Sequence, residues 1–194
     1  MCMSVLLRKK LNENSILNDR IDTENIVNKL KQLYAEEIQA WYQYYIVSKF
    51  MQGQERKSIE NFFDETAHDE LDDHANKLLK RISELGGDIS SIDNINNLRS
   101  LAHCDYITPN YPYITIKLLE DNIKSEICAI QHYIELADIT KDKDYTTYNI
   151  AMDILADEEE HLRGLQDFYT DITGHEYETY HFNVYSEIEK RETF

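Results

Sequence analysis

Four apolar stripes constrain the fold of this chain more than any other feature. They span residues 30–51, 59–85, 116–137 and 151–172. Steps of three and four residues place the apolar side chains of each stripe on one face of a helix. The chain has only five glycines and two prolines, too few for the many tight turns of a β-protein. The sequence therefore predicts an all-α fold with four long helices.

Residues typical of helix ends bound these stripes. Asp22 or Thr23 can cap the start of the first helix. Gly86 and Gly87 provide the left-handed stop that is favoured at the end of the second. The polar run 141–144 separates the third stripe from the fourth. The first and third links between helices are thus expected to be short.

The link between the second and third stripes is different. Residues 88–112 are rich in serine and asparagine and include both prolines, so they are too broken for a long helix and too long for a hairpin loop. One long link lets the second and third helices of a four-helix bundle run parallel. We expect the bundle to cover residues 22–174, with an N-terminal arm over 1–21 and a C-terminal tail over 175–194.

Charge and composition exclude several classes of protein. The 37 acidic residues against 20 basic ones give a formal charge of −17, which repels nucleic-acid phosphates and attracts cations. DNA binding is disfavoured, since the basic run at 8–10 is short. There is no signal-peptide core and no stretch near the ~20 apolar residues of a membrane span. The sequence therefore predicts a cytoplasmic protein without membrane contact.

Each apolar stripe has a gap, and a carboxylate fills each gap at a position that should face the core. Two of the four carboxylates are followed by a histidine on the same helical face. The candidate ligands are Glu37, Glu70, His74, Glu126, Glu158 and His161.

Such a set is costly in an apolar core unless cations are present. Each buried, ionised and unpaired carboxylate costs several kcal/mol, and two imidazoles cannot offset four of them. Carboxylates with imidazoles suit iron or manganese. One Glu from each of two helices, with a Glu and a His from each of the other two, is the ligand arrangement of di-iron carboxylate bundles. We therefore predict two iron ions per subunit, for which manganese or zinc can substitute.

The two halves of the chain repeat this pattern. Glu37 precedes Glu70 by 33 positions, and Glu126 precedes Glu158 by 32. Seven residues after the first glutamate of each half lies a tyrosine, Tyr44 or Tyr133. The repeat predicts a pseudo-two-fold axis and two similar metal positions.

One spacing departs from the pattern. The fourth stripe has a Glu-x-x-His spacing, whereas Glu70 and His74 are four residues apart. A strict search for Glu-x-x-His would instead choose Glu65 and His68, which share a solvent-facing line with Asn61. Spacings of three and four both keep two side chains on one face, so we favour Glu70 and His74.

These residues resemble the ferritin superfamily, and more closely its Dps-like members called thioferritins. The resemblance covers roughly residues 22–174. It rests on the glutamates and histidines above, on the run Arg81-Ile82-Ser83-Glu84-Leu85-Gly86-Gly87, on Glu126-Ile127-Cys128-Ala129-Ile130 and on Glu158-Glu159-Glu160-His161. The thioferritin mark is a cysteine in the crossover and another two residues after the third-helix glutamate, matched by Cys104 and Cys128.

The resemblance implies a ferritin-like four-helix bundle with a bacterioferritin-type di-iron site. Glu70 and Glu158 would bridge the irons, Glu37 and His74 would complete one position, and Glu126 and His161 the other. Such proteins assemble as twelve-subunit cages, oxidise Fe(II) with hydrogen peroxide or dioxygen, and store the ferric mineral, which protects against oxidative stress. The enzyme class implied is a ferroxidase that consumes peroxide.

Two further roles concern residues beside the ligands, and the resemblance implies the first of them. Cys104 and Cys128 would form a redox disulfide near the site, although the residues alone leave an unconnected pair of buried thiols open. Tyr44 is a candidate electron relay, but a core tyrosine with a bonded hydroxyl is the favoured interpretation. Cys2 has no assigned role.

Two rival functions remain. A rubrerythrin-like di-iron peroxidase would turn over peroxide without storing mineral, and many such proteins carry two Cys-x-x-Cys pairs, which this sequence lacks. A DNA-condensing structural protein would need a longer basic arm than residues 8–10. Mineral loading separates the first rival from a storage protein, and a gel-shift assay at low salt tests the second.

Overall fold

The computed structural model describes residues 22–106, 110 and 115–177. In this part of the chain the regular elements are all helical, which confirms the predicted all-α fold. The predicted arm, 1–21, and all but the first three residues of the predicted tail, 175–194, lie outside the described residues. None of the described helices is long and apolar enough to cross a membrane.

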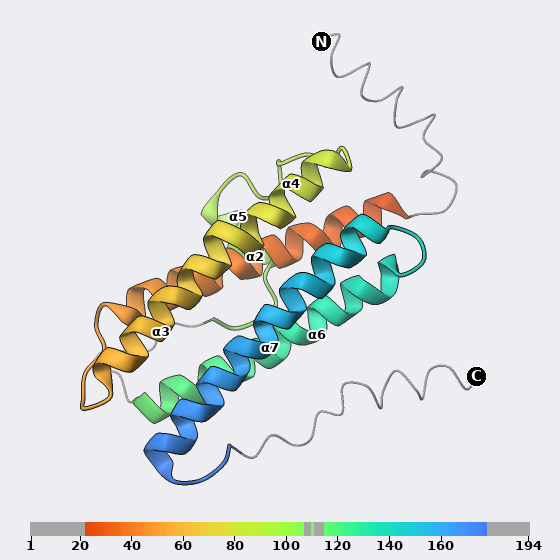
Figure 1. Ribbon diagram of the computed structural model, residues 1–194. Coiled ribbons are helices and arrows are strands. Elements are labelled where there is room, and N and C mark those ends of the chain that lie inside the picture. Colours follow the sequence, from red (N-terminus) through yellow and green to blue (C-terminus); the bar gives the residue numbers. More distant parts are fainter. Residues whose placement is uncertain (1–21, 107–109, 111–114, 178–194) are drawn as a thin grey trace.

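Four long helical rods form the bundle (Figure 1). The second rod is continuous but is wound in three segments, α3, a π-helical segment η1, and α4. The rods are α2 (Thr23–Ser48), α3–η1–α4 (Arg56–His68, Asp69–Ala75 and Asn76–Glu84), α6 (Thr115–Thr140) and α7 (Tyr145–Thr173). The second rod and α6 run parallel, as the long crossover requires (Figure 1).

Caps explain where the rods begin and end. The Asp22 side chain accepts a hydrogen bond from the Asn25 N–H and starts α2. Asp144 does the same for α7 through the Thr147 N–H. Gly86 and Gly174 have φ values of 78° and 71°, the left-handed conformation that glycine adopts most readily. The predicted ends at Asp22, at Gly86 and near residue 141 are therefore found in the structure.

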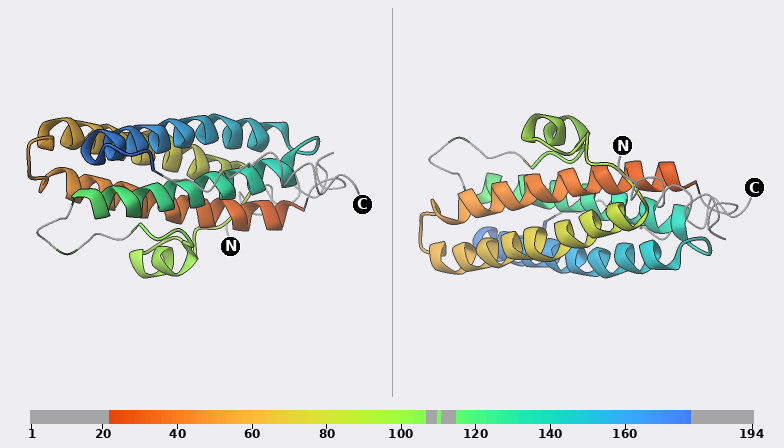
Figure 2. Two further views of the ribbon diagram at one scale, coloured as in Figure 1. Left: turned by 90° about the horizontal axis from the view of Figure 1, so that it is seen from below. Right: turned by 90° about the horizontal axis from the view of Figure 1, so that it is seen from above.

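The crossover holds a short helix that the sequence pattern did not predict. This helix, α5 (Ile95–Leu101), packs on the outside of the bundle against α2 (Figure 2). Asn94 caps it by accepting from the Asn97 N–H. Seven residues are too few to show a helical period above the background of a polar segment, which is why the pattern missed it.

Two apolar clusters fill the bundle on either side of its midpoint. One joins the first half of α2 to α4, to the second half of α6 and to the first half of α7, and includes Leu30, Leu78 and Ile154. The other joins the end of α2 to the starts of α3 and α6, with Phe63 and Ile123. The gaps in all four stripes fall between these clusters, so the polar residues that fill them meet at mid-bundle.

Candidate metal centre

The six predicted ligands meet at this midpoint and are buried. None is more than 6 % exposed. They form two groups that share two glutamates, and within each group the ligand atoms lie within 4.8 Å of one another. The groups are Glu37, Glu70, His74 and Glu158 on one side, and Glu70, Glu126, Glu158 and His161 on the other.

The four-residue spacing of Glu70 and His74 has a structural cause. Both lie in the π-helical segment Asp69–Ala75. A π turn bonds residue i to i+5 and so contains one residue more than an α turn. His74 Nδ1 therefore lies 3.0 Å from Glu70 Oε2, and its ring stands 5.9 Å from the ring of His161 on the regular helix α7.

Two tyrosines link the halves of the centre reciprocally. Tyr44, on the helix of Glu37, donates a hydrogen bond to Glu126. Tyr133, on the helix of Glu126, donates one to Glu37. Both rings are fully buried. The sequence repeat pointed to these tyrosines, but not to the exchange of partners between halves.

The crossover adds a third phenol to one half alone. Tyr106 Oη lies 3.4 Å from Glu126 Oε2, and its ring packs edge-on against Tyr44. Among the described residues, Glu37 has no corresponding partner from the crossover. Sequence reasoning missed Tyr106 because it lies in a segment without a period.

Two aspartates were also missed. Asp157 lies 3.4 Å from His74 Nε2, and Asp69 lies 3.5 Å from His161 Nε2. Each aspartate directly precedes the glutamate of its own helix and reaches the histidine of the other. Such outer carboxylates orient a metal-ligating imidazole. The repeated Asp-Glu pair at 69–70 and 157–158 was a signal that could have found them.

In the metal-free protein, protons bound to the glutamates and histidines offset the negative charge of the four carboxylates. Burial, with the negative charge of Glu158, raises the pKa of Glu70 and Glu126 well above the usual value. Burial alone would also raise the pKa of Glu158, but the neighbouring imidazoles of His161 and His74, at 3.5 and 3.3 Å, hold this pKa below its usual range.

Burial acts on the pKa of the imidazoles in the opposite direction. Burial by itself lowers the pKa of His161, but Asp69 and Glu158 outweigh it and raise this pKa to about 11. The pKa of His74 is raised as well, against the effect of burial, by Glu158, Glu37 and Glu70. Two protonated imidazoles thus occupy the position where cations would bind.

The donor set fits two divalent ions. Buried ligand atoms at the centre make no hydrogen bond of good geometry, namely Glu70 Oε1, both carboxylate oxygens of Glu158 and His161 Nδ1. They lie 3.3–3.5 Å from their oppositely charged neighbours. Carboxylate oxygens, together with imidazole nitrogens that lose their protons on binding, suit iron or manganese.

An acidic pocket of about 270 Å³ leads from the surface to this centre between α3 and α7. It is lined by Phe62, Glu65, Thr66, Asp69, Asp157, Glu160 and His161. Glu65 thus lies at the entrance, exposed to solvent, while His68 pairs with Asp72 on the surface. The structure does not bring the alternative pair, Glu65 and His68, into the centre.

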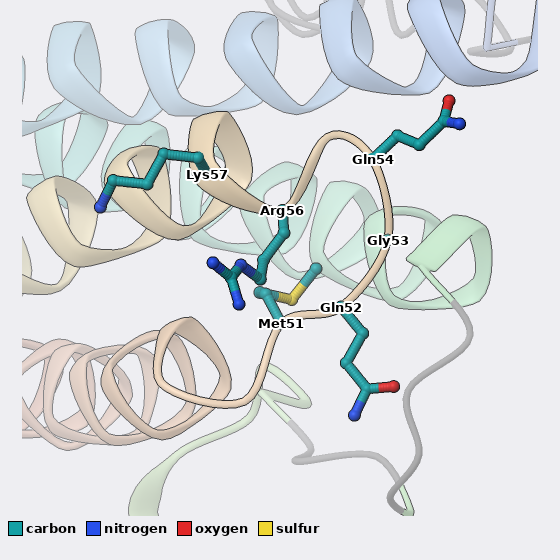
Figure 3. A pocket seen from close by; sticks show the side chains of 6 residues that line it. All are labelled: Met51, Gln52, Gly53, Gln54, Arg56 and Lys57. Carbon is teal, nitrogen blue, oxygen red and sulfur yellow. The ribbon is translucent and has the colours of Figure 1, made fainter.

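A second pocket, of about 420 Å³, lies at the α2–α3 loop and is shown in Figure 3. It is lined by Met51, Gln52, Gly53, Gln54, Arg56 and Lys57. None of these side chains is a carboxylate or an imidazole, so the pocket offers no ligand set for a divalent ion.

A disulfide joins the crossover to α6 beside the centre. It links Cys104 to Cys128, whose Cα atoms are 5.7 Å apart. Glu126 faces inward, whereas Cys128 lies on the outer side of α6 and lines a surface pocket. Cys128 is therefore placed behind the metal centre and outside both ligand groups.

Comparison with known proteins supports the same architecture. A family model described as a ferritin-like domain matches residues 27–174. The DNA protection during starvation protein of Pyrococcus furiosus is 32 % identical over 151 residues, which cover 77 % of this chain and 80 % of that protein.

Solved structures extend the comparison. A dodecameric thioferritin from Bacteroides fragilis is 37 % identical with a TM-score of 0.77, covering 84 % of this chain and 94 % of that one. Dps from Thermosynechococcus elongatus is 16 % identical with a TM-score of 0.69, covering 75 % and 90 %, and shows the fold alone. The chain therefore belongs to the ferritin-like family, as a relative of the Dps proteins and thioferritins.

Proposed function

We propose that this protein is an iron-oxidising mini-ferritin. It oxidises Fe(II) with hydrogen peroxide or dioxygen at a di-iron site and stores the ferric mineral inside a twelve-subunit cage, which protects against oxidative stress. The observation that carries the proposal is the pair of buried ligand groups that share Glu70 and Glu158. The relatives named as a starvation-protection protein and a dodecameric thioferritin support the storage and cage assignments.

Each proposed ligand has a defined role. Glu70 and Glu158 would contribute to both metal positions because both belong to each group. Glu37 and His74 would complete one position, and Glu126 and His161 the other. The Nδ1 atoms of the histidines face the glutamates, while their Nε2 atoms face Asp157 and Asp69.

Two ferrous ions bound side by side supply two electrons together, which with two protons reduce one hydrogen peroxide to two waters without releasing a hydroxyl radical. Side chains of the protein take up or release the protons that accompany metal binding and orient the carboxylate ligands. His74 and His161 must lose their Nδ1 protons to bind metal, so binding releases protons. The hydroxyls of Tyr44 and Tyr133 fix the orientation of Glu126 and Glu37.

The acidic entrance provides a route for the substrate. Four carboxylates line the pocket that ends at His161, namely Glu65, Asp69, Asp157 and Glu160. Together with the formal charge of −17, they raise the local concentration of cations and disfavour binding to DNA.

Anaerobic titration of the apoprotein with Fe(II), followed by separate additions of peroxide and dioxygen, tests the proposal. We expect two Fe(II) per subunit before oxidation, and many ferric ions per subunit after repeated additions. A protein that turns over peroxide but keeps about two irons would instead be a rubrerythrin-like peroxidase. Size measurement should give a closed cage of about a dozen subunits at all salt concentrations tested.

A further inference from the structure

A polar network that the iron chemistry does not use lies beside the disulfide. His132 Nδ1 is 3.4 Å from Cys104 Sγ and 2.9 Å from Glu36 Oε2. Glu36 is 1 % exposed and also accepts hydrogen bonds from the Gln32 side chain and the His103 N–H. His132 is therefore held in place by a buried carboxylate on α2, with its Nδ1 close to one sulfur of the disulfide.

The two sulfurs have different surroundings. Cys104 is 2 % exposed. Cys128 is half-buried and lines a pocket of about 450 Å³. The other lining residues are His103, Asp105, Lys117, Asp121, Lys124 and Ser125. An external thiol can therefore reach Cys128 from the pocket, whereas Cys104 is shielded.

Thiol–disulfide exchange depends on this kind of difference. A thiolate attacks the accessible sulfur, and the other sulfur leaves faster when its thiolate is stabilised. We propose that this pocket binds a small zwitterionic thiol, which reduces the disulfide by attacking Cys128 while Cys104 leaves beside His132.

The exchange runs in two balanced steps. The incoming thiolate forms a bond to Cys128 Sγ, the Cys104–Cys128 bond breaks, and the Cys104 thiolate accepts a hydrogen bond from His132 Nδ1–H, which it shares with Glu36 Oε2. A second thiolate then attacks the sulfur of the bound thiol and releases Cys128. Overall, two thiols and the protein disulfide become one small disulfide and two protein thiols, with the two protons of the thiols passing to the cysteines.

The pocket favours a small ligand that carries both charges. Its volume lies in the range of small-molecule sites. Lys124 and Lys117 can meet a carboxylate, and the exposed Asp105 can meet an ammonium group, although Lys117 also pairs with Asp121. A γ-glutamyl peptide thiol such as glutathione has this chemistry and is the probe used below. The proposal is independent of iron oxidation.

The first test identifies the sulfur that is attacked. Oxidised protein carrying Cys2→Ser is mixed with limiting glutathione, quenched within seconds by an alkylating agent and digested for mass spectrometry. We expect glutathione on Cys128 and the alkyl group on Cys104, by at least tenfold over the reverse. Glutathione found mainly on Cys104, or equally on both, would overturn the proposal.

The second test separates the roles of His132 and the pocket. His132→Asn should slow reduction about tenfold because it removes the group that stabilises the leaving thiolate, whereas His68→Asn on the surface should not. Lys124→Glu should slow glutathione several-fold but leave neutral 2-mercaptoethanol unchanged, and Lys80→Glu should slow neither. Thermal unfolding of each variant identifies any loss of folding.

Two results contradict the pocket assignment even if the variants fold normally. One is equal slowing of both thiols by Lys124→Glu. The other is reduction by a protein dithiol alone, with no reaction from glutathione at millimolar concentration.

Discussion

The two halves of the metal centre hold the same pair of ligands on differently wound helices. On α7, Glu158 and His161 are three residues apart in a regular α-helix. On the second rod, Glu70 and His74 are four apart within a π-helical segment. Both histidines present Nδ1 to the shared glutamates and Nε2 to an aspartate of the other helix. The two halves therefore have the spatial arrangement of their ligands in common, and not the sequence spacing of those ligands.

The largest expected effect comes from removing what the halves share. Glu158→Gln or Glu70→Gln takes one ligand from both groups at once, so Fe(II) oxidation should fall by about 100-fold or more, beyond the 10–100-fold typical of outer-shell changes. Glu65→Gln, at the entrance, is the matched control and should lose far less. Stopped-flow absorbance of ferric product measures both. If Glu65→Ala and His68→Ala abolish oxidation while Glu70→Ala and His74→Ala do not, the ligands were assigned to the wrong face.

The difference in winding can be tested by deletion. Removing the exposed Asp72 takes one residue from the π segment and should leave a continuous α-helix with Glu-x-x-His spacing. We expect a folded protein whose oxidation rate stays within about tenfold of the parent, because the rest of α4 keeps its register. Deleting Glu159 from α7 has no such extra residue to absorb it and should rotate the following residues by about 100°. Circular dichroism and iron titration would show whether the two deletions behave alike, in which case the π segment does not explain the spacing.

Much of this architecture could be predicted from residues with a regular period. The four stripes, the caps at Asp22 and Gly86, and the inward glutamates all repeat with the period of a helix, and burial follows from that period. The formation of η1 could not be predicted in this way, because three- and four-residue spacings are both compatible with one helical face. The sequence indicated only that Glu70 and His74 departed from the spacing on α7.

Features without a period were harder to predict. Helix α5 is short, and Tyr106 and His103 lie in the crossover after it, where position depends on tertiary contacts. The partners of Tyr44 and Tyr133 depend on how two helices face each other across the bundle. Contacts between segments that are distant in the sequence cannot be predicted from the residue spacing within either segment.

The charge balance of the two halves predicts a pH dependence of the apoprotein. The folded-state pKa of His161 is about 11, above the ~6.5 of an unfolded histidine. Its contribution to stability is therefore complete below about pH 6.5 and is lost as pH rises toward 11. Between pH 7 and pH 9 one such group accounts for at most roughly 2–3 kcal/mol.

This loss should be visible in unfolding experiments. Thermal unfolding of metal-free protein should show a melting temperature that falls across this pH range. His161→Gln should flatten the fall, and redox-inert Zn(II) should raise the melting temperature most at the alkaline end, where the metal displaces the histidine protons at a lower free-energy cost. A melting temperature that rises with pH in the apoprotein would contradict the proton balance described for the centre.

Replacing the outer aspartates should change metal affinity by an intermediate amount. Asp69→Asn and Asp157→Asn each keep the shape of the side chain but weaken the hydrogen bond that it accepts from the Nε2–H of the opposite histidine. Each should lower metal affinity at one position by about tenfold, Asp69→Asn at the His161 side and Asp157→Asn at the His74 side. Anaerobic titration monitored by Mössbauer spectroscopy can separate the two irons. Asp153→Asn, on the exposed face of α7, is the control. Equal loss at both positions from either change would show that the halves are not independently supported.

The smallest effect concerns Tyr106, the residue that most distinguishes the two halves. Its hydroxyl lies 3.4 Å from Glu126, a long hydrogen bond, whereas Tyr44 bonds to the other oxygen of the same carboxylate. Removing a weak hydrogen bond to a charged group costs about 1 kcal/mol. Tyr106→Phe should therefore weaken iron binding two- to fivefold at the Glu126 side and leave the Glu37 side unchanged. Tyr44→Phe and Tyr133→Phe should give larger losses of similar size on opposite sides. If Tyr106→Phe instead matches Tyr44→Phe, the crossover contributes as much to its half of the centre as the bundle does, and the two halves are less alike than the sequence repeat indicates.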